Sequence, residues 1–560
     1  MPPTLGMSRI LSMHFLRRNR TPSLQLSRNI SITCRGKPIG HDELYRYTNG
    51  RFLIDEKSQC ERRYVKFNLY GLCDVAASVG GSNSPITAIE KMEGGFSKAL
   101  LMRKEDGTEL ITKIPCPNAG PAFYTTASEV AVLQYVRHHT TVPVPKVLAW
   151  SFDPHSSNPV GSEYIIMEKA AGTQLFKVWS DMDEPSRLAL IKRLTQLESE
   201  LASIYFPAFG NLYLRQSVAD ETKCKLLDSS IAPSNAYCIG PSCHRSWLVE
   251  TSTGTSDPEL DRGPWTSISA FGIALAEREI FRILHTPPPE GSVIRHGTIR
   301  EQISLLEMTI ELMKSLESHV VLARYGKPTL WHTDLHMGNV FFSDEDPSQI
   351  LSIIDWQSIS VSPLFSQTRW PEFLHPPKSY TMGFVKPELP DDFDRLSPED
   401  RDLAMYEWKQ ATRAKAYEVS SYLNNREAFH AMNTPSVFRE LFVRCGKTWE
   451  EGSVPLRACL IEIFQTWRDL GLPDGCPYTF VEDDIKAHEV EFKEYEEWHK
   501  VHEFAREYLD TDADGWISPE TDFGEKLKQN KALFELFLNE SAGKRSSQEA
   551  RRMWPFSEGI

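Results

Sequence analysis

The sequence is poor in cysteine, has no long apolar run and carries no excess of basic charge. Ten cysteines are scattered over 560 residues, which excludes the disulfide framework of small secreted domains. No apolar run reaches the roughly 18 residues that a membrane-spanning helix needs, so we expect no transmembrane segment. The net charge of -14 argues against a nucleic-acid partner, because phosphate binding needs a basic face. The composition is that of a globular protein with several structural units.

Only one group of cysteines has a spacing similar to that of metal ligands. Cys238, Cys243 and His244 lie close together in the sequence. A structural zinc site needs a second ligand pair at similar spacing, and none accompanies them. Ordinary thiols are therefore the favoured interpretation.

Acidic residues are missing altogether before Asp42. The same stretch contains seven basic residues: Arg9, Arg17, Arg18, Arg20, Arg28, Arg35 and Lys37. Serines are frequent, and apolar residues lie between the arginines. An acid-free, Arg-rich and Ser-rich amphipathic start is typical of a mitochondrial transit peptide. We therefore interpret residues 1–41 as a transit peptide, with a cut near Arg28, and predict a mitochondrial protein. A disordered basic tail is the alternative.

A small β lobe is predicted over residues 83–168. Glycine turns at 94–95 and 106–107 separate strand-like runs, and Asp-Gly between such runs indicates a hairpin. Further strands are expected near 144–152 and 163–167.

Two charged residues stand out in this lobe. Lys113 lies on the strand 108–114, and Glu129 lies on the apolar face of a helix that we expect to begin at Thr125 or Thr126. A carboxylate on an apolar helical face needs a partner once it is buried. Lys113 is the natural candidate for Glu129.

The later sequence has helical periodicity. Helices are predicted near 184–205, 268–285, 300–324, 398–424, 436–446, 454–470, 485–509 and 523–540. Strands followed by helices indicate an α+β protein with a small antiparallel β lobe and a larger, mainly helical lobe. The acidic run 489–497 on one of these helices includes aromatic residues and is typical of a solvated amphipathic helix.

The chemistry concentrates between residues 331 and 356. Asp334 and Asn339 lie on a loop before a short strand, and Asp355 ends the next, strongly apolar strand. We expect these two carboxylates and the amide to converge beside a hairpin. Mg²⁺ prefers such oxygen ligands, and a second carboxylate can accept the proton of an attacking hydroxyl. The set therefore predicts phosphoryl transfer.

These residues carry a family resemblance. His332-x-Asp334-Leu335-His336-x-x-Asn339, followed by Ile353-Ile354-Asp355-Trp356, is similar to the catalytic loop and metal-binding Asp of the aminoglycoside phosphotransferase and choline kinase group. The resemblance implies a protein-kinase-like bilobal fold. Trp356 stands where protein kinases have Phe-Gly, which fits the small-molecule kinases better.

The resemblance also implies roles for individual residues, with ATP and Mg²⁺ as cofactors and a hydroxyl compound of unknown identity as the acceptor. Asp334 is implied as the catalytic base, and Asn339 and Asp355 as Mg²⁺ ligands. The implied nucleotide-binding residues are Gly94, Gly95, Phe96 and Ser97 in the turn, Lys113 held by Glu129, and Met167 and Glu168 at the hinge. His332 is implied to brace the loop, and His336 has no assigned role.

Other segments narrow the resemblance. The chain is similar to the fungal altered inheritance of mitochondria protein 9 family in residues 45–51, 261–265, 363–365 and 369–373. This similarity extends from about residue 42 to the last 20 residues. Either substrate binding or ordinary packing accounts for Trp265, Phe365 and Trp370 in these segments. No acceptor role can be assigned to carboxylates such as Glu372.

The sequence thus divides into five parts: a transit peptide (1–41), an N-terminal extension (42–82), an N-lobe (83–168), a C-lobe (169–480) and a helical extension (481–560). The predicted function is a mitochondrial, ATP- and Mg²⁺-dependent phosphotransferase acting on a small molecule or a protein. A pseudokinase that binds nucleotide or acts as a scaffold is the alternative. An atypical kinase of the quinone pathway fits the loop less well.

One further motif resembles the start of a calcium loop. Residues 510–518 match the EF-hand pattern at several positions, but position 12 is Thr521 instead of the bidentate Glu, and Pro519 disturbs the exit helix. A turn after a capped helix end is favoured over a weak Ca²⁺ site.

Overall fold

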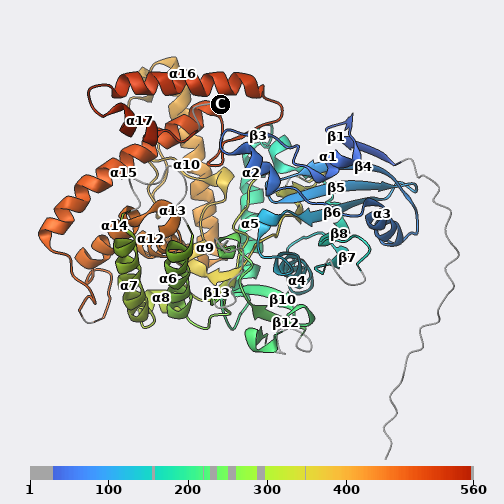
Figure 1. Cartoon of the computed structure of the whole chain (residues 1–560), viewed down its shortest axis with the longest axis horizontal. Coiled ribbons are helices and arrows are strands. Elements are labelled where there is room, and N and C mark those ends of the chain that lie inside the picture. Colours follow the sequence, from blue (N-terminus) through green and yellow to red (C-terminus); the bar gives the residue numbers. More distant parts are fainter. Residues whose placement is uncertain are drawn as a thin grey trace, which may run out of the picture.

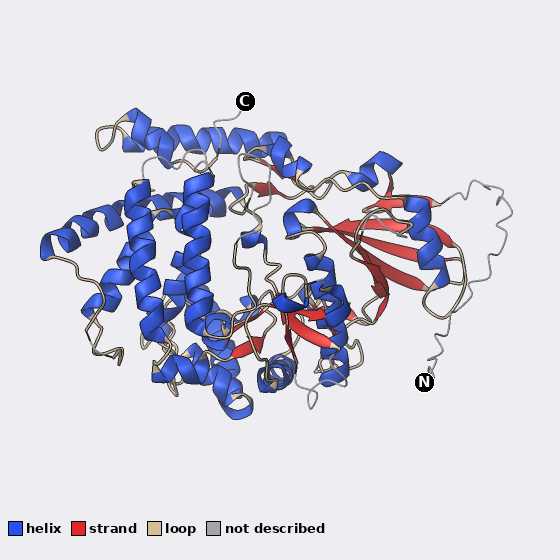
Figure 2. Cartoon of the chain, turned by 60° about the horizontal axis from the view of Figure 1, so that its bottom comes forward, coloured by secondary structure: helices blue, strands red, loops and turns tan. Residues whose placement is uncertain are grey.

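A seven-stranded sheet forms the core of the smaller of two lobes, and a helical bundle forms the larger (Figures 1 and 2). The computed structural model describes residues 30–153, 158–218, 220–227, 236–249, 260–286, 297–346, 348–473 and 475–556. The two-lobed α+β arrangement predicted from the sequence is confirmed. None of the helices in these ranges combines the length and the apolar character needed to cross a membrane.

The sheet of the small lobe has the strand order β2-β1-β4-β5-β6-β8-β7. Its strands are β1 (Ser31–Cys34), β2 (Lys37–Pro38), β4 (Ile86–Glu93), β5 (Ser97–Lys104), β6 (Glu109–Pro115), β7 (Val147–Ser151) and β8 (Tyr164–Glu168). All neighbours pair antiparallel except β1 and β4, which are parallel. The hairpin predicted at Asp106-Gly107 joins β5 to β6, with Gly107 in the left-handed conformation that this turn needs.

Each face of the sheet is covered by helices. On one face, Leu110, Thr112 and Ile114 of β6 are buried, and Leu110 and Ile114 join a core cluster with α1 (His41–Tyr45) and α3 (Leu69–Ser78). The opposite face of β6 carries Lys113 and faces α4 (Tyr124–His139). The alternation predicted for this strand therefore sets which residues reach α4.

The folded part begins before the predicted transit peptide ends. Ser31–Cys34 form β1, whose Ile32 is 6% exposed and pairs with Ile89. Residues 31–38 therefore contribute the edge strands β1 and β2 to the sheet, and a cut near Arg28 would leave both strands in place. Residues 1–29, which contain most of the leader-like sequence, lie outside the described residues. The extension 42–82 likewise belongs to the small lobe, since α3 covers its sheet.

The start of α4 differs from the sequence expectation. The helix begins at Tyr124 with Phe123 as its N-cap, and neither Thr125 nor Thr126 caps it. Thr125 instead donates its hydroxyl to the Pro121 carbonyl at 3.0 Å. The Phe123 N–H donates to Glu163 Oε1 at 2.8 Å. The Glu163 carboxylate, just before β8, thus accepts a backbone N–H at the start of the helix. The sequence around residue 124 does not indicate this distant partner.

The larger lobe is mainly helical. Its helices and those of the C-terminal extension are α5 (Glu184–Ser203), α6 (Ile268–His285), α7 (Ile299–Leu316), α8 (Val320–Tyr325), α9 (Leu364–Gln367), α10 (Pro398–Asn424), α11 (Arg426–Met432), α12 (Ser436–Cys445), α13 (Thr448–Glu451), α14 (Ser453–Gln465), α15 (Glu482–Leu509), α16 (Phe523–Ser541) and α17 (Ser547–Met553). The helix predicted over 300–324 is two helices, because the chain breaks at 317–319 and His319 caps α8.

Short strands complete the fold. They are β3 (Arg51–Phe52), β9 (Thr173–Gln174), β10 (Asn211–Leu214), β11 (Lys225–Leu226), β12 (Tyr237–Gly240), β13 (Pro328–Leu330), β14 (Val340–Phe342), β15 (Ile350–Ile353), β16 (Val361–Pro363) and β17 (Trp516–Ile517). Trp265 and Phe365 are buried in the helical core, as ordinary packing predicts. Trp370 is half-buried and donates its indole N–H to the Ala414 carbonyl at 3.2 Å.

The C-terminal extension returns to the small lobe. In Figure 1 α15, α16 and α17 lie above the bundle, and the chain between α15 and α16 approaches β3. There β17 pairs antiparallel with β3. The calcium-like loop of 510–518 makes this connection: the Asp512 carboxylate accepts from the N–H groups of Asp514 and Trp516, both at 2.9 Å. Among the described residues there is no cluster of three or more His, Cys, Asp or Glu that could hold a metal, and this includes Cys238, Cys243 and His244.

A buried carboxyl joins α5 to α10. The Tyr417 hydroxyl donates to Glu198 Oε2 at 2.8 Å, and both residues are buried. Burial raises the pKa of Glu198 to about 8, against the opposing hydrogen bond from Tyr417. Glu198 is therefore neutral in the folded protein at neutral pH, whereas an unfolded glutamate titrates near pH 4.3.

We expect this carboxyl to make stability depend on pH. A raised pKa stabilises the folded state fully below about pH 4, and that stability is lost progressively as pH rises towards 8. Glu198→Gln removes the titrating group and should flatten this fall, which is on the order of a few kcal/mol. The apparent Tm, measured by calorimetry between pH 5 and 8.5, checks it. The exposed Glu407→Gln on α10 is the control. An equally steep fall of Tm in Glu198→Gln and wild type would contradict the assignment.

Candidate active site

Lys113 lies at the junction of the two lobes and contacts both. Its ammonium is 2.8 Å from Glu129 Oε1 on α4 and 2.6 Å from Asp355 Oδ1, just after β15. The side chains of Lys113 and Glu129 are 13% and 4% exposed, whereas that of Asp355 is 43% exposed. The structure thus makes the Lys113–Glu129 pair that the sequence predicts and adds Asp355 as a second partner.

The electrostatics favour the charged forms of Lys113 and Asp355, whereas burial raises the pKa of Glu129 against the opposing charge of Lys113. Burial lowers the pKa of Lys113, but Asp355 and Glu129 outweigh burial and hold that pKa above its ordinary value. Burial likewise raises the pKa of Asp355, yet the nearby ammonium brings that pKa below its usual range. Lys113 is therefore a permanent cation, and Asp355 remains an anion with one face open to solvent.

The hairpin β14–β15 positions Asp355. Val340 pairs with Ile353, and the N–H of Ile354 donates to the Asn339 carbonyl at 3.0 Å. Asp355 has a φ of +63°, a left-handed conformation that costs a non-glycine residue about 1 kcal/mol or more. The chain turns sharply there, and the carboxylate leaves the apolar strand to meet Lys113.

Two aromatic rings hold this turn. The Trp356 side chain is 1% exposed and donates its indole N–H to the Ile353 carbonyl at 3.0 Å. His332 Nε2 lies 3.0 Å from the Ile354 carbonyl, and its ring meets Trp356 edge-on at 4.7 Å. Burial lowers the pKa of His332, so a neutral ring donates to that carbonyl. His332 therefore braces the loop in the structure.

Asp334 and Asn339 lie on the loop before β14. Asp334 is exposed, and its backbone carbonyl accepts the side-chain amide of Asn339 at 2.9 Å. This bond uses the Asn339 NH₂ and leaves its Oδ1 as an acceptor. His336 Nδ1 accepts the Gly338 N–H at 3.0 Å, which shapes the turn between Asp334 and Asn339.

The donor set fits a magnesium ion. Asn339 Oδ1 and the carboxylate of Asp355 are hard oxygen donors on adjacent ends of one hairpin, joined by the hydrogen bond between Ile354 and Asn339. Two protein ligands suit Mg²⁺, which retains waters and takes its other oxygens from substrate phosphates. Asn339 and Asp355, the two residues predicted as metal ligands, thus carry the kind of donor atoms that the ion prefers.

The glycine turn between β4 and β5 is tied to this group. The Ser97 hydroxyl donates to Gln357 Oε1 at 2.8 Å, which joins the turn to the loop after Asp355. A Cβ added at Gly94 or Gly95 would meet nothing within 4 Å, so the backbone here leaves space for a ligand. The Arg245 guanidinium lies over the Phe96 ring, with its Cζ atom 4.4 Å from the ring centroid.

Sequence reasoning missed the residues that hold this turn. The Gly95 carbonyl accepts from Arg63 Nε at 3.0 Å and from Asn118 Nδ2 at 3.2 Å. Arg63 is 3% exposed, lies over the Tyr47 and Phe52 rings, and reaches Asp514 at 3.5 Å. The sequence signal nearest to this contact is the family-like segment 45–51, which supplies the Tyr47 ring beneath Arg63.

Met167 and Glu168 lie at the end of β8, where the chain passes to the larger lobe. Met167 is 7% exposed and pairs with Ile111, while Glu168 is exposed. Gly172 follows, and a Cβ there would lie 2.2 Å from the Phe342 carbonyl. Only glycine permits this close approach of the hinge to β14.

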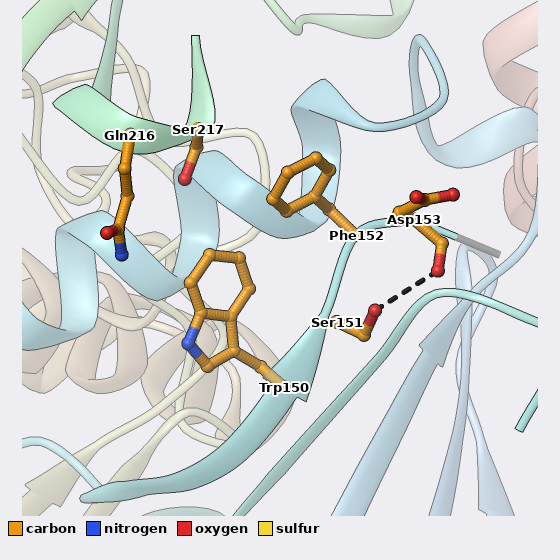
Figure 3. A pocket seen from close by; sticks show the side chains of 6 residues that line it. All are labelled: Trp150, Ser151, Phe152, Asp153, Gln216 and Ser217. Carbon is orange, nitrogen blue, oxygen red and sulfur yellow. Dashed lines mark hydrogen bonds between the residues drawn. The ribbon is translucent and has the colours of Figure 1, made fainter. Parts of the chain in front are cut away.

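A separate pocket of about 300 Å³ lies beyond β7 (Figure 3). It is lined by Trp150, Ser151, Phe152, Asp153, Gln216 and Ser217. The Ser151 hydroxyl donates to the Asp153 carbonyl at 3.1 Å, and the Trp150 and Phe152 rings are 5.7 Å apart. None of the site residues predicted from the sequence lines this pocket.

Comparisons with known proteins find similarity over the segment that carries these residues and over most of the chain. Residues 264–366, which include Asp334, Asn339 and Asp355, match the phosphotransferase enzyme family. A subtelomeric hrmA-associated cluster protein of Aspergillus fumigatus is 29% identical over 506 residues, covering 83% of this chain and 96% of its own. Altered inheritance of mitochondria protein 9, mitochondrial, of Lachancea thermotolerans is 23% identical over 534 residues. The match covers 81% of this chain and 85% of that protein.

Among solved structures, aminoglycoside phosphotransferase APH(2″)-Ib with bound ADP covers 69% of this chain and 98% of its own, at 12% identity and a TM-score of 0.31. The mitochondrial name of the Lachancea relative agrees with the location predicted from the sequence. The resemblance stated from the loop motif is confirmed. Residues 264–366 of this chain thus match the phosphotransferase enzyme family, within a longer sequence that is similar to the altered inheritance of mitochondria protein 9 proteins.

Proposed function

We propose that this protein is a mitochondrial phosphotransferase that uses ATP and Mg²⁺ to phosphorylate a hydroxyl group of its acceptor. The observation that carries the proposal is the Lys113 ammonium between Glu129 and Asp355, at 2.8 and 2.6 Å. Asp355 is linked through the hairpin to Asn339 and the loop of Asp334. These are the charges that phosphoryl transfer requires, in one place.

Each residue has a role that follows from its position. Lys113 is fixed by Glu129 and directs its positive charge at the ATP phosphates, while the backbone of the Gly94–Ser97 turn covers them. Asn339 and Asp355 would hold Mg²⁺, which would supply positive charge to the transferring phosphate. Met167 and Glu168 border the adenine base at the hinge.

The transfer itself involves Asp334. The acceptor hydroxyl oxygen forms a bond to the γ-phosphorus as the bond from that phosphorus to the ADP oxygen breaks. Asp334 is exposed and accepts the hydroxyl proton, so atoms and charges balance with ADP as the leaving group. The protein supplies position and charge and forms no covalent intermediate.

We expect Asp334→Asn to separate binding from chemistry. The variant retains Lys113, Asn339 and Asp355, so Mg²⁺-dependent ATP binding should remain within about threefold of wild type. The proton acceptor is lost, so turnover should fall by about 10²–10⁴-fold. Isothermal titration with Mg-ATP and phosphate transfer from labelled ATP to a metabolite library measure the two properties.

The exposed Asp344→Asn, on the β14–β15 turn, is the matched control and should behave as wild type. ATP binding without any transfer that depends on Asp334 would reject the enzyme and support the nucleotide-binding scaffold. A wild-type protein that does not bind Mg-ATP would contradict both functions.

Arg63 is proposed as a positioning residue for the nucleotide turn. Its Nε fixes the Gly95 carbonyl, and a lysine cannot reproduce the planar fork that also reaches Asp514 and the Gln59 carbonyl. Arg63→Lys should raise the KM for ATP by about tenfold, with a smaller fall in kcat at saturating ATP. Steady-state kinetics at fixed acceptor concentration show the split.

The neighbouring Arg62 is exposed and makes no side-chain hydrogen bond or ion pair within the described residues, so Arg62→Lys is its control. An Arg63→Lys enzyme with an unchanged KM for ATP would show that the turn does not depend on this contact.

The location of the protein is testable with two truncations. Removing residues 1–29 takes away most of the basic, acid-free stretch and spares β1, so the protein should remain folded and stay in the cytosol of fungal cells. Removing residues 1–41 also takes away β1 and β2 and should lower the Tm. Cell fractionation and calorimetry measure these outcomes. Import of the 30–560 protein into mitochondria would contradict the transit-peptide interpretation.

A further inference from the structure

An arginine lies directly beside the loop of Asp334. Arg369 follows α9, and its guanidinium donates to the Thr333 carbonyl at 2.5 Å. Thr333 immediately precedes Asp334, so this positive charge contacts the residue next to the proposed base. The Arg369 side chain is exposed and has N–H groups left over after this bond.

A second arginine supports the first. Arg439, on α12, donates from Nε to the Phe365 carbonyl at 3.0 Å and from its NH2 nitrogen to the Thr368 carbonyl at 3.2 Å. Thr368 is the neighbour of Arg369, so two guanidinium groups gather at one short segment. Burial and the charge of Arg369 lower the pKa of Arg439, although Glu440 opposes them.

Neither cation has a carboxylate partner within the described residues. Ion pairs at up to 4.0 Å account for the other cations nearby: Arg413 with Glu184 at 2.5 Å and Lys415 with Glu418 at 2.7 Å. Glu440, the sequence neighbour of Arg439, pairs instead with Arg444 at 3.0 Å. Arg369 and Arg439 are held by backbone carbonyls alone, which orient the guanidinium groups without neutralising them.

We propose that Arg369, supported by Arg439, binds a carboxylate or phosphate group of the acceptor, so that the acceptor is a hydroxyl compound carrying negative charge. This inference rests on the proposed phosphotransferase function. An acceptor whose hydroxyl meets Asp334 extends past Thr333 to Arg369. Arginine donates two parallel hydrogen bonds to either oxyanion, a geometry matched to both groups.

The alternative role for these cations is nucleotide binding. The proposed ATP phosphates lie near Lys113 and Asp355, which belong to β6 and the turn after β15. Within the described residues, the Arg369 side chain makes no hydrogen bond or ion pair to Lys113, Asn339 or Asp355, and its guanidinium contacts Thr333, the residue before the base. Because Arg369 is bound beside the proposed base and not to Lys113 or Asp355, we assign the arginine pair to the acceptor.

The binding test uses the full protein with its nucleotide site filled. With saturating Mg²⁺ and the non-hydrolysable analogue AMP-PNP, titration with inorganic phosphate or acetate should raise the Tm of wild type saturably. For whichever anion raises the Tm of wild type, Arg369→Gln should weaken its binding by at least tenfold, while the affinity for AMP-PNP should change less than twofold. Arg369→Lys keeps the charge and should give an intermediate value.

Arg506→Gln, on α15, is the control for loss of a positive charge elsewhere and should match wild type. If AMP-PNP binds but neither anion raises the Tm, or if both act equally on wild type and Arg369→Gln, the arginine pair is not an anion site. Absence of AMP-PNP binding would instead refute the proposed function, which keeps the two failures distinct.

Transfer assays distinguish the kind of anion. Labelled ATP is offered with glyceric acid, glycerol 3-phosphate, glycerol, choline or kanamycin. We expect labelling of glyceric acid or of glycerol 3-phosphate, whichever anionic group fits, with its KM raised at least tenfold in Arg369→Gln. Preferential labelling of choline or kanamycin would overturn the proposal. Two arginines without carboxylate partners repel a cationic acceptor.

Discussion

The shared ammonium of Lys113 is the interaction on which the arrangement of the two lobes depends. It lies between Glu129 of the small lobe and Asp355 of the larger one, at 2.8 and 2.6 Å. Lys113 and Glu129 are buried, and removal of one partner from a buried pair typically costs about 3–5 kcal/mol because the other charge is left unpaired. The β6 strand, α4 and the β14–β15 hairpin are therefore held in one register relative to each other, since any shift would leave a charge unpaired.

The same junction depends on segments from both ends of the chain. Arg63 fixes the Gly95 carbonyl from one side and reaches Asp514 of the C-terminal extension from the other. Trp516 adds an indole hydrogen bond to the Asn49 carbonyl at 2.7 Å. A turn of two glycines is by itself conformationally permissive. Here its position is set by side chains that lie 30 residues before it and more than 400 residues after it.

Local patterns predicted much of the architecture and part of the site. Period-two alternation placed Lys113 opposite the buried face of β6, and the 3.6-residue periodicity placed Glu129 on α4. The same reasoning failed where distant groups replace local signals. The start of α4 is capped by Glu163 and not by a threonine of its own.

The sequence by itself determined the residue types and spacing of the loop 332–339 and of Asp355, because oxygen ligands and a base at fixed intervals serve few chemistries. It also determined the two-lobed α+β class, since strand and helix periodicities are local properties. Only the tertiary structure decided that Asp355 shares the ammonium of Lys113, that Arg63 holds the glycine turn, and that Arg369 and Arg439 gather beside Thr333 without a carboxylate. These contacts join residues tens to hundreds of positions apart, and the packing of the lobes sets them.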